Sequence, residues 1–367
     1  MAGEADRRFM AAAIRLARRH EGRTGSNPSV ATLIVRDTPS GPVIIGRGVT
    51  AIGGRPHAEP QAIAEAGELA RGATAYVTLE PCAHHGRTPP CADALVAAGI
   101  ARVVGAATDP DERVSGKGYA ILRAAGLAVE EAVLAEEAAR DLAGYLTRRT
   151  RNRVHVTLKL AVSADGMIGR RGAGQVAITG PLARRQAHMM RAISDVILVG
   201  SGTALADDPE LTCRLPGLER RSPVRLVLDR DLKLPATSKL AMTARAVPLW
   251  IATSAAADDP RRAALAAAGA EFLAADCEDG QLALPELLED IAARGLSTAM
   301  VEGGAEVARA FLAEDLVDRL VLFSGPGTVG AGGIASPVTR GTIPDGFRRV
   351  ASYVFGEDAM EEYERIR

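Results

Sequence analysis

Three residues in the N-terminal part of the chain have the types and spacing of zinc ligands. The segment H-A-E begins at His57, and the segment P-C-A-H-H-G-R-T-P-P-C contains Cys82 and Cys91. An imidazole and two thiolates suit one tetrahedral Zn²⁺ ion and leave its fourth position open. Zinc lowers the pKa of a water in that position to about 7. Glu59 could pass a proton from this water to a leaving amine, so the set predicts a hydrolytic deaminase centre.

The elements predicted around these residues would bring them together. We expect helices over 57–66 and 90–98, with a strand over 75–79 between them. Cys82 then follows the strand, and Cys91 lies in the first turn of the second helix. Backbone N–H groups and the helix dipole at such a terminus stabilise a thiolate, which is the form that binds metal.

The spacing of the two cysteines differs from the usual nucleobase deaminase pattern. That pattern is P-C-x-x-C, whereas eight residues separate Cys82 from Cys91. Either cysteine alone would ordinarily be an inert buried thiol. The combination of H-x-E before a helix, P-C after a strand and Cys at a helix start favours the metal centre.

The composition argues against several classes of protein. The chain is 47% hydrophobic and 24% charged, with a formal net charge of −1, which is typical of a globular protein. Aromatic residues make up only 3%, which disfavours a nucleic-acid surface built on stacking. No run approaches the roughly 18 apolar residues of a membrane span, and the first residues lack an apolar signal segment. We expect a cytoplasmic protein, with reduced cysteines, that binds neither nucleic acid nor membrane.

The length of 367 residues favours two domains. The basic, polar segment R-R-T-R-N-R at 148–153 is the predicted boundary, which gives domains over 1–149 and 150–367. Helices alternate with strands in both halves, so we expect α/β folds with largely parallel sheets. The predicted elements include one long helix over 135–149 and a loop over 200–209.

Two glycine-rich segments of the second half could bind phosphate groups. A G-x-G-x-x-G sequence begins at Gly325, but Pro326 lies inside it and no helix is predicted after it, so we interpret it as a loop. The Gly303–Gly304 pair joins a predicted strand over 298–301 to a helix over 306–312. Backbone N–H groups of glycines at a helix N-terminus can bind a diphosphate. A tight turn between strand and helix without a ligand would have the same sequence.

Several single residues of the second half allow both a functional and a purely structural interpretation. Arg191 and Arg214 could clamp a phosphate, although single arginines are usually surface residues. Asp207, in the predicted loop with Thr203, would by itself most often be a cap or turn residue.

Several segments resemble the bifunctional riboflavin-biosynthesis deaminase/reductase family. In the first half they are N-P-S-V at 27–30, H-A-E at 57–59, Y-V-T-L-E-P-C-A-H-H-G-R-T-P-P-C at 76–91 and D-P-D-E-R-V-S-G-K-G at 109–118. In the second half they are T-L-K-L-A-V-S-A-D-G at 157–166, I-T-G-P-L-A-R-R at 178–185, G-T-A-L-A-D-D-P-E-L-T-C-R at 202–214 and V-E-G-G at 301–304. The match covers nearly the whole chain in the right order.

This resemblance implies a cytidine deaminase-like α/β/α domain followed by a dihydrofolate reductase-like α/β domain. The first would hydrolyse the C2 amino group of 2,5-diamino-6-(5-phosphoribosylamino)pyrimidin-4-one. The second would use NADPH to reduce the ribosyl group of the product, 5-amino-6-(5-phosphoribosylamino)uracil, to ribityl. Its partners would be small phosphoribosyl pyrimidines, and we expect a homo-oligomer.

The resemblance also assigns residues of the first half by position. His57, Cys82 and Cys91 would bind zinc, and Glu59 would move protons. The residues that would contact the pyrimidine and its phosphoribosyl arm are Asn27, His84 and Arg87.

In the second half the resemblance implies a cofactor set and a substrate set. The residues that would hold NADPH are Ala161, Ala177, Thr203, Asp207, Gly303, Gly304, Ala305 and Glu306. The residues that would hold the substrate are Gln175, Arg191, Leu211, Arg214 and Glu302. Lys159 and Glu302 would lie near the ribose carbon that receives the hydride.

Three positions depart from the family pattern, and parts of the sequence are also compatible with two other functions. Ala31 replaces the usual Gly of N-P-x-V-G, Gln175 replaces Ser, and Ala177 replaces Trp. The first alternative is a deaminase of free cytidine, guanine or tRNA adenosine fused to an unrelated domain, which the long insert between the cysteines disfavours. The second is a non-catalytic zinc module, which the open fourth ligand position disfavours.

Overall fold

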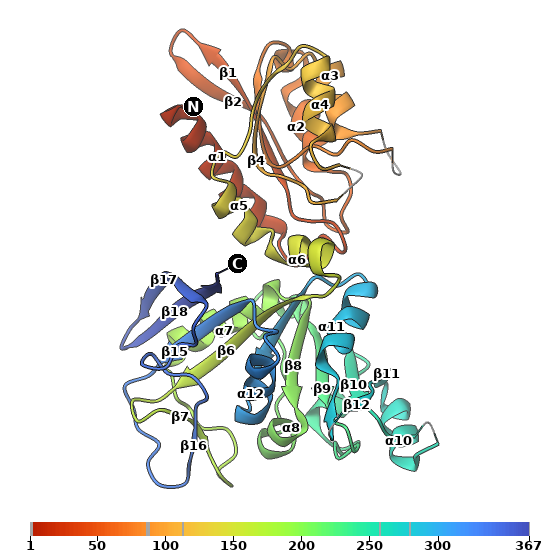
Figure 1. The fold of residues 1–367 in the computed structure, drawn as a ribbon, viewed down its shortest axis with the longest axis vertical. Coiled ribbons are helices and arrows are strands. Elements are labelled where there is room, and N and C mark those ends of the chain that lie inside the picture. Colours follow the sequence, from red (N-terminus) through yellow and green to blue (C-terminus); the bar gives the residue numbers. More distant parts are fainter. Residues whose placement is uncertain (1–2, 86–88, 112–113, 257, 279, 367) are drawn as a thin grey trace. The chain divides into compact units, whose positions relative to one another are not determined.

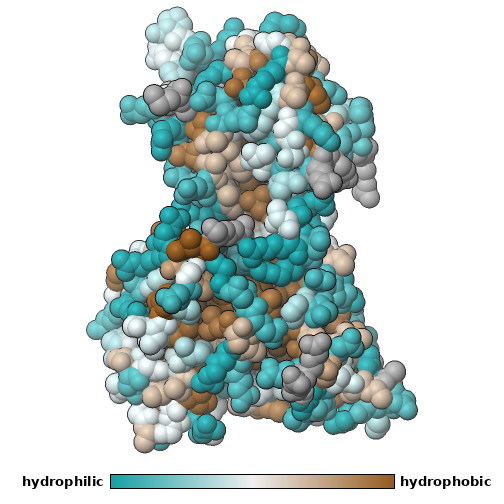
Figure 2. All heavy atoms as spheres, viewed as in Figure 1, coloured by the Kyte–Doolittle hydropathy of each residue, from teal (hydrophilic) through white to brown (hydrophobic). Residues whose placement is uncertain are grey.

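The computed structural model describes residues 3–85, 89–111, 114–256, 258–278 and 280–366. The chain separates into two compact units, Met1–Asn152 and Arg153–Arg367 (Figure 1). None of the helices formed by the described residues is long and apolar enough to cross a membrane. On the face seen in Figure 2, hydrophilic residues predominate and hydrophobic residues form smaller patches between them.

The first unit is a three-layer α/β/α arrangement. Its elements are α1 (Glu4–Ala17), η1 (Arg18–His20), β1 (Ala31–Thr38), β2 (Gly41–Val49), α2 (Ala58–Ala66), η2 (Gly67–Ala70), β3 (Thr74–Leu79), α3 (Cys91–Ala97), β4 (Arg102–Ala107), α4 (Lys117–Ala124), β5 (Ala128–Glu130), α5 (Ala135–Asp141) and α6 (Ala143–Arg151). The sheet order is β2-β1-β3-β4-β5. Strand β1 is antiparallel to β2 and β3, whereas β3, β4 and β5 are parallel. Helices α1 and α5 lie on one side of the sheet, and α2, α3 and α4 lie on the other (Figure 1).

The second unit is built on a nine-stranded sheet. Its elements are β6 (His155–Val162), β7 (Met167–Arg170), α7 (Pro181–Ile193), β8 (Val196–Gly200), α8 (Ser201–Asp207), η3 (Glu219–Arg221), β9 (Val224–Leu228), α9 (Lys239–Met242), β10 (Leu249–Thr253), α10 (Pro260–Ala268), β11 (Glu271–Ala274), β12 (Cys277–Glu278), β13 (Gln281–Leu282), α11 (Leu284–Ala293), β14 (Thr298–Glu302), α12 (Ala305–Ala313), β15 (Arg319–Ser324), β16 (Gly333–Ala335), β17 (Phe347–Phe355) and β18 (Asp358–Arg365).

The sheet of the second unit is parallel over most of its width. Its order is β11-β10-β9-β8-β14-β6-β15-β18-β17, and only β18 runs antiparallel to its neighbours, β15 and β17. Strand β8, in the interior of this sheet, is buried on both faces, as its continuous apolar run V-I-L-V requires. Val196 and Leu198 join a core with residues of α11 and α12, whereas Ile197 and Val199 join a core with residues of α9 and α10.

The predicted α/β class is confirmed, but several predicted elements are wrong. The sheet of the first unit is mixed rather than largely parallel. The helix expected over 135–149 is interrupted at Leu142, two residues before Gly144, a poor helix former. The loop expected over 200–209 contains α8. The segment 148–153, which contains the predicted domain boundary, is helical up to Arg151, and the two units divide within it, after Asn152.

Candidate metal centre and reductase site

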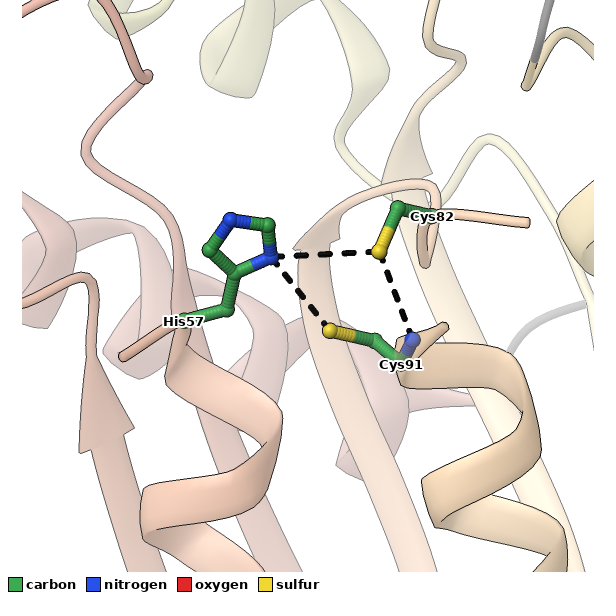
Figure 3. Close-up of side chains that lie close together, drawn as sticks. All are labelled: His57, Cys82 and Cys91. Atoms are coloured by element: carbon green, nitrogen blue, oxygen red, sulfur yellow. Dashed lines mark hydrogen bonds between the residues drawn. The ribbon is translucent and has the colours of Figure 1, made fainter. Parts of the chain in front are cut away.

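His57, Cys82 and Cys91 meet where three elements begin or end (Figure 3). His57 precedes α2, Cys82 follows β3, and Cys91 is the first residue of α3. The Nδ1 atom of His57 lies 3.8 Å from Cys82 Sγ and 3.4 Å from Cys91 Sγ. Zinc bonds of ordinary length in tetrahedral geometry would place such ligand atoms about 3.6 Å apart. The donor atoms and their separations therefore fit Zn²⁺.

The backbone before His57 is fixed by a glycine turn against Asn27. Gly53 and Gly54 have φ of +81° and +91°, a conformation that favours glycine. A Cβ atom on Gly54 would lie 2.4 Å from Asn27 Nδ2 and 2.6 Å from the Thr24 carbonyl oxygen. Asn27 therefore lies against the turn that leads into the metal centre.

Cys82 is held as a thiolate by its neighbours. The backbone N–H of Cys91, at the start of α3, donates to Cys82 Sγ at a distance of 3.3 Å. The hydrogen bonds from Cys91, followed by that from His57, lower the pKa of Cys82 to about 4, although burial opposes this shift. A sulfur that is ionised at neutral pH is ready to bind a metal ion.

Glu59 lies in the first turn of α2, two residues after His57, and only 4% of its surface is exposed. Burial raises the pKa of its carboxyl, and the charge on Cys82 raises it further. An acid that shares this buried position with the candidate ligands is suitably placed to exchange protons with a group in the open metal position.

Of the other two residues predicted to contact the pyrimidine substrate, the structure describes His84 but not Arg87. His84 lies between β3 and α3, and its Nδ1 atom is buried without a hydrogen-bond partner among the described residues. Buried polar atoms are rarely left unpaired, so this nitrogen is available to a ligand. Arg87 lies outside the described residues.

Glu80 supports the metal centre and was missed by the sequence analysis. Its buried carboxylate accepts the backbone N–H groups of Gly116 and Gly118 at 3.1 Å and that of Asp109 at 3.4 Å. A Cβ atom on Gly118 would lie 2.0 Å from the carbonyl oxygen of Pro81, the residue before Cys82. The available signal was an acid at the end of an otherwise apolar strand, directly before P-C.

In the second unit, Lys159, Arg191 and Glu302 form a largely buried charged cluster. Lys159 of β6 and Glu302 of β14 are direct partners on neighbouring parallel strands, with Lys159 Nζ 3.1 Å from Glu302 Oε1. Arg191 of α7 contacts Glu302 Oε2 through Nε at 2.9 Å and Nη2 at 2.7 Å. Burial alone would raise the pKa of Glu302, but Arg191 and Lys159 outweigh it and lower that pKa to about 2. Glu302 therefore stays ionised and fixes both cations.

The Gly303–Gly304 turn fits a bound phosphate group. Both glycines have positive φ, +83° and +75°, and Gly304 directly precedes α12. A Cβ atom on Gly304 would lie 2.9 Å from Thr203 Oγ1, so the backbone is bare where α8 approaches it. Strands β8 and β14 are adjacent and parallel, so the start of α8 and the Gly303–Gly304 turn, which follow them, lie at the same edge of the sheet. Ligands bind at this edge in open α/β folds.

The other residues predicted for the reductase site are spread around this edge. Ala161 lies in β6, and Asp207, whose carboxyl pKa is raised by burial, ends α8. Gln175 and Ala177 are exposed in the segment between β7 and α7. On α12, Ala305 is buried and Glu306 is exposed.

The two arginines predicted to bind the substrate phosphate, Arg191 and Arg214, have different partners and different exposure. Arg191 is committed to Glu302 and to the carbonyl oxygen of Thr212, whereas the exposed Arg214 pairs with Glu210 at 2.9 Å. Leu211 is buried and has φ of +55°, an unusual conformation for a bulky residue.

The G-x-G-x-x-G sequence is a loop, in agreement with its interpretation from Pro326. The carboxylate of Asp165 accepts the N–H groups of Val329 and Gly330 at 3.1 and 2.8 Å. A Cβ atom on Gly325 would lie 2.0 Å from the carbonyl oxygen of Ile178. These two backbone donors are thus used inside the protein, and the described chain continues into strand β16 rather than a helix.

Comparison with known proteins gives the same two-part division. The model for the cytidine and deoxycytidylate deaminase zinc-binding region matches residues 3–107, and the model for the RibD C-terminal domain matches residues 154–360. The riboflavin biosynthesis protein RibD of Bacillus amyloliquefaciens is 39% identical over 322 residues, covering 88% of this chain and 85% of the relative. The Escherichia coli K12 protein is 37% identical over 337 residues, covering 89% of each chain.

Two solved structures are similar over the full length. RibD from Acinetobacter baumannii superimposes with a TM-score of 0.85 at 34% identity, covering 99% of both chains. The diaminohydroxyphosphoribosylaminopyrimidine deaminase/5-amino-6-(5-phosphoribosylamino)uracil reductase from Thermotoga maritima gives a TM-score of 0.84 at 33% identity, covering 98% of both. The cytidine deaminase-like and reductase-type folds predicted for the two halves are confirmed.

Proposed function

Because the chain belongs to the RibD family of bifunctional riboflavin-biosynthesis enzymes, we propose that the His57–Cys82–Cys91 centre and the Lys159–Arg191–Glu302 cluster carry its two activities. The enzyme is a deaminase and a reductase whose substrates are small phosphoribosyl pyrimidines, and its cofactors are zinc and NADPH. The proposal concerns which residues perform each step.

In the first step, water replaces the C2 amino group of the diaminopyrimidine and ammonia leaves. His57, Cys82 and Cys91 would hold zinc, which when bound supplies Lewis-acid activation of the attacking water. Glu59 takes a proton from that water and returns it to the departing amine. Asn27, His84 and Arg87 orient the pyrimidine and its phosphoribosyl arm. The observation that supports this assignment best is that the three candidate ligand atoms lie within 4.8 Å of one another.

In the second step, the ribosyl group of the deaminated product is reduced to ribityl. NADPH supplies the hydride, and the protein supplies position and charge. The Gly303–Gly304 turn, with Ala305 and Glu306 behind it, would hold the cofactor together with Thr203, Asp207, Ala161 and Ala177. Lys159 and Glu302 face the ribose carbon that is reduced. The substrate is held further by Gln175, Arg191, Leu211 and Arg214.

Further proposals concern the extent of the two domains, the location of the enzyme and its assembly. We assign the first activity to residues 1–149 and the second to residues 150–367. We also propose that the enzyme works in the cytoplasm as a homo-oligomer.

The zinc content of cysteine variants tests the metal centre. The wild-type chain should contain about one zinc ion, because three protein ligands in this geometry form a complete catalytic set. Cys82→Ser and Cys91→Ser should each lower that content at least tenfold. Cys277→Ser is the matched control, because Cys277 is exposed and lies in the other unit. Full zinc content in either ligand variant, measured by atomic absorption after dialysis, would contradict the assignment.

A further inference from the structure

Helix α7 holds the segment Thr212–Arg214 at two points. Nη1 of Arg191 donates to the Thr212 carbonyl oxygen at 3.0 Å, and Nδ1 of His188 accepts the backbone N–H of Arg214 at 3.3 Å. His188 and Arg191 are three residues apart, so they lie on the same face of α7. One side chain therefore donates to this segment and the other accepts from it.

The contact with His188 requires a particular state of its ring. Nδ1 can accept a hydrogen bond only when it carries no proton. Burial lowers the pKa of His188, and the positive charges of Arg191 and Arg214 lower it further; the charge of Glu302 and a hydrogen bond to the Thr212 backbone raise this pKa but do not outweigh the other causes. The environment thus favours the neutral ring that the observed contact needs.

The segment needs such support because its own conformation is unfavourable. Leu211, which directly precedes the segment, has φ of +55°, which costs energy in any residue other than glycine. The Arg214 side chain is exposed and pairs with Glu210. Strained backbone of this kind persists where neighbouring groups fix it, and it is common at binding sites. A further backbone contact of this segment is the N–H of Cys213, which donates to Ser222 Oγ at 3.0 Å.

We propose that His188 is a positioning residue of the reductase site, which holds the backbone of Arg214 so that Leu211 and Arg214 meet the phosphorylated end of the substrate. The inference rests on the proposed function, because it takes the segment 211–214 to be part of the substrate site. His188 was not among the residues predicted from the sequence. It acts through the segment and makes no contact with the reacting atoms.

Three substitutions separate positioning from simple packing. The side-chain oxygen of asparagine can occupy the position of histidine Nδ1, whereas that of glutamine reaches further, to the position of Nε2. His188→Asn therefore keeps the acceptor, while His188→Gln and His188→Ala lose it. Met189→Ala is the control, because Met189 is the next residue of α7 and is exposed.

The test is steady-state kinetics of the full chain with 5-amino-6-(5-phosphoribosylamino)uracil and NADPH. The substrate KM should rise about tenfold in His188→Ala and His188→Gln, as expected for the loss of one hydrogen bond. It should stay within about twofold of the wild type in His188→Asn and in the control, and the KM for NADPH should stay within about twofold in all variants.

Two results would overturn the inference while leaving the proposed function intact. One is an unchanged substrate KM in His188→Ala and His188→Gln. The other is a loss in His188→Asn as large as in His188→Ala, or an equal rise in the KM for NADPH, because either would indicate a packing role. A wild-type chain that fails to reduce this substrate would instead overturn the proposed function, and the inference with it.

Discussion

Replacing Glu59 by glutamine should lower the deamination rate by roughly a thousandfold and leave the zinc content unchanged. Proton transfer by a positioned acid or base contributes about 10² to 10⁴ in rate. Glutamine has nearly the same shape as glutamate but can neither accept nor release the proton. Glu59 is buried in the first turn of α2, next to His57. The substitution should therefore remove the chemistry and preserve the geometry.

The prediction for Glu59→Gln is tested by measuring zinc content and the rate of ammonia release on the same preparation. Glu65→Gln is the matched control, because Glu65 lies on the same helix and makes an exposed ion pair with Arg47 at 2.6 Å. It should change neither quantity. If zinc is lost together with activity, Glu59 is a ligand rather than a proton carrier. If deamination persists at the wild-type rate, another group carries the proton.

Replacing Glu302 by glutamine should lower the reductase rate at least a hundredfold and destabilise the second unit. Glu302 neutralises Lys159 and Arg191, and the three side chains are only 12%, 14% and 11% exposed. Removing one partner of a buried ion pair leaves an uncompensated charge and costs about 3 kcal/mol or more. Lys159 and Arg191 would then repel each other and leave the positions that Glu302 imposes on them.

Reduction of supplied 5-amino-6-(5-phosphoribosylamino)uracil and thermal unfolding measure this effect. Deamination by Glu302→Gln should continue at the wild-type rate, because the metal centre lies in the other unit. Glu289→Gln, at an exposed position of α11, is the control and should retain both activities. A Glu302→Gln protein that reduces its substrate normally would show that the cluster is not part of the reductase site.

The three candidate zinc ligands could be predicted from the sequence because each lies next to a short motif that marks the end of a helix or strand. His57 begins a helix after a Gly-Gly turn, and Cys91 lies at the start of the next helix, after P-P. Residues at the ends of successive elements on one sheet tend to meet. Sequence alone placed these residues at element ends, and the fold supplied the separations of 3.4 and 3.8 Å between His57 Nδ1 and the two sulfurs.

The supporting residues could not be predicted in this way. Glu80 and His188 act by accepting backbone N–H groups from segments that are distant in sequence. Asp358 does the same, since its Oδ2 atom accepts the N–H of Gly180, at the start of α7, at 2.7 Å. Such contacts leave no periodicity or motif in the chain. They depend on which segments the fold brings together.

Helix α8 was missed because its sequence has the composition of a loop. The run G-S-G-T-A-L-A-D-D-P begins and ends with residues that favour turns. Packing outweighs this preference, because Ala204 of α8 is buried in a core with Val199 of β8 and Val227 of β9. The error matters for the site, because Thr203 and Asp207 are presented by a helix rather than a flexible loop.

The most direct test of the account is NADPH oxidation by the purified chain when the diaminopyrimidine substrate is the only pyrimidine supplied. Oxidation should follow ammonia release, stop after zinc is removed by a chelator, and return when zinc is restored. Supplying 5-amino-6-(5-phosphoribosylamino)uracil should support oxidation even in the zinc-free protein. Oxidation of NADPH with the diaminopyrimidine in the absence of zinc would contradict the account. The same is true if the intact enzyme oxidises no NADPH with either pyrimidine.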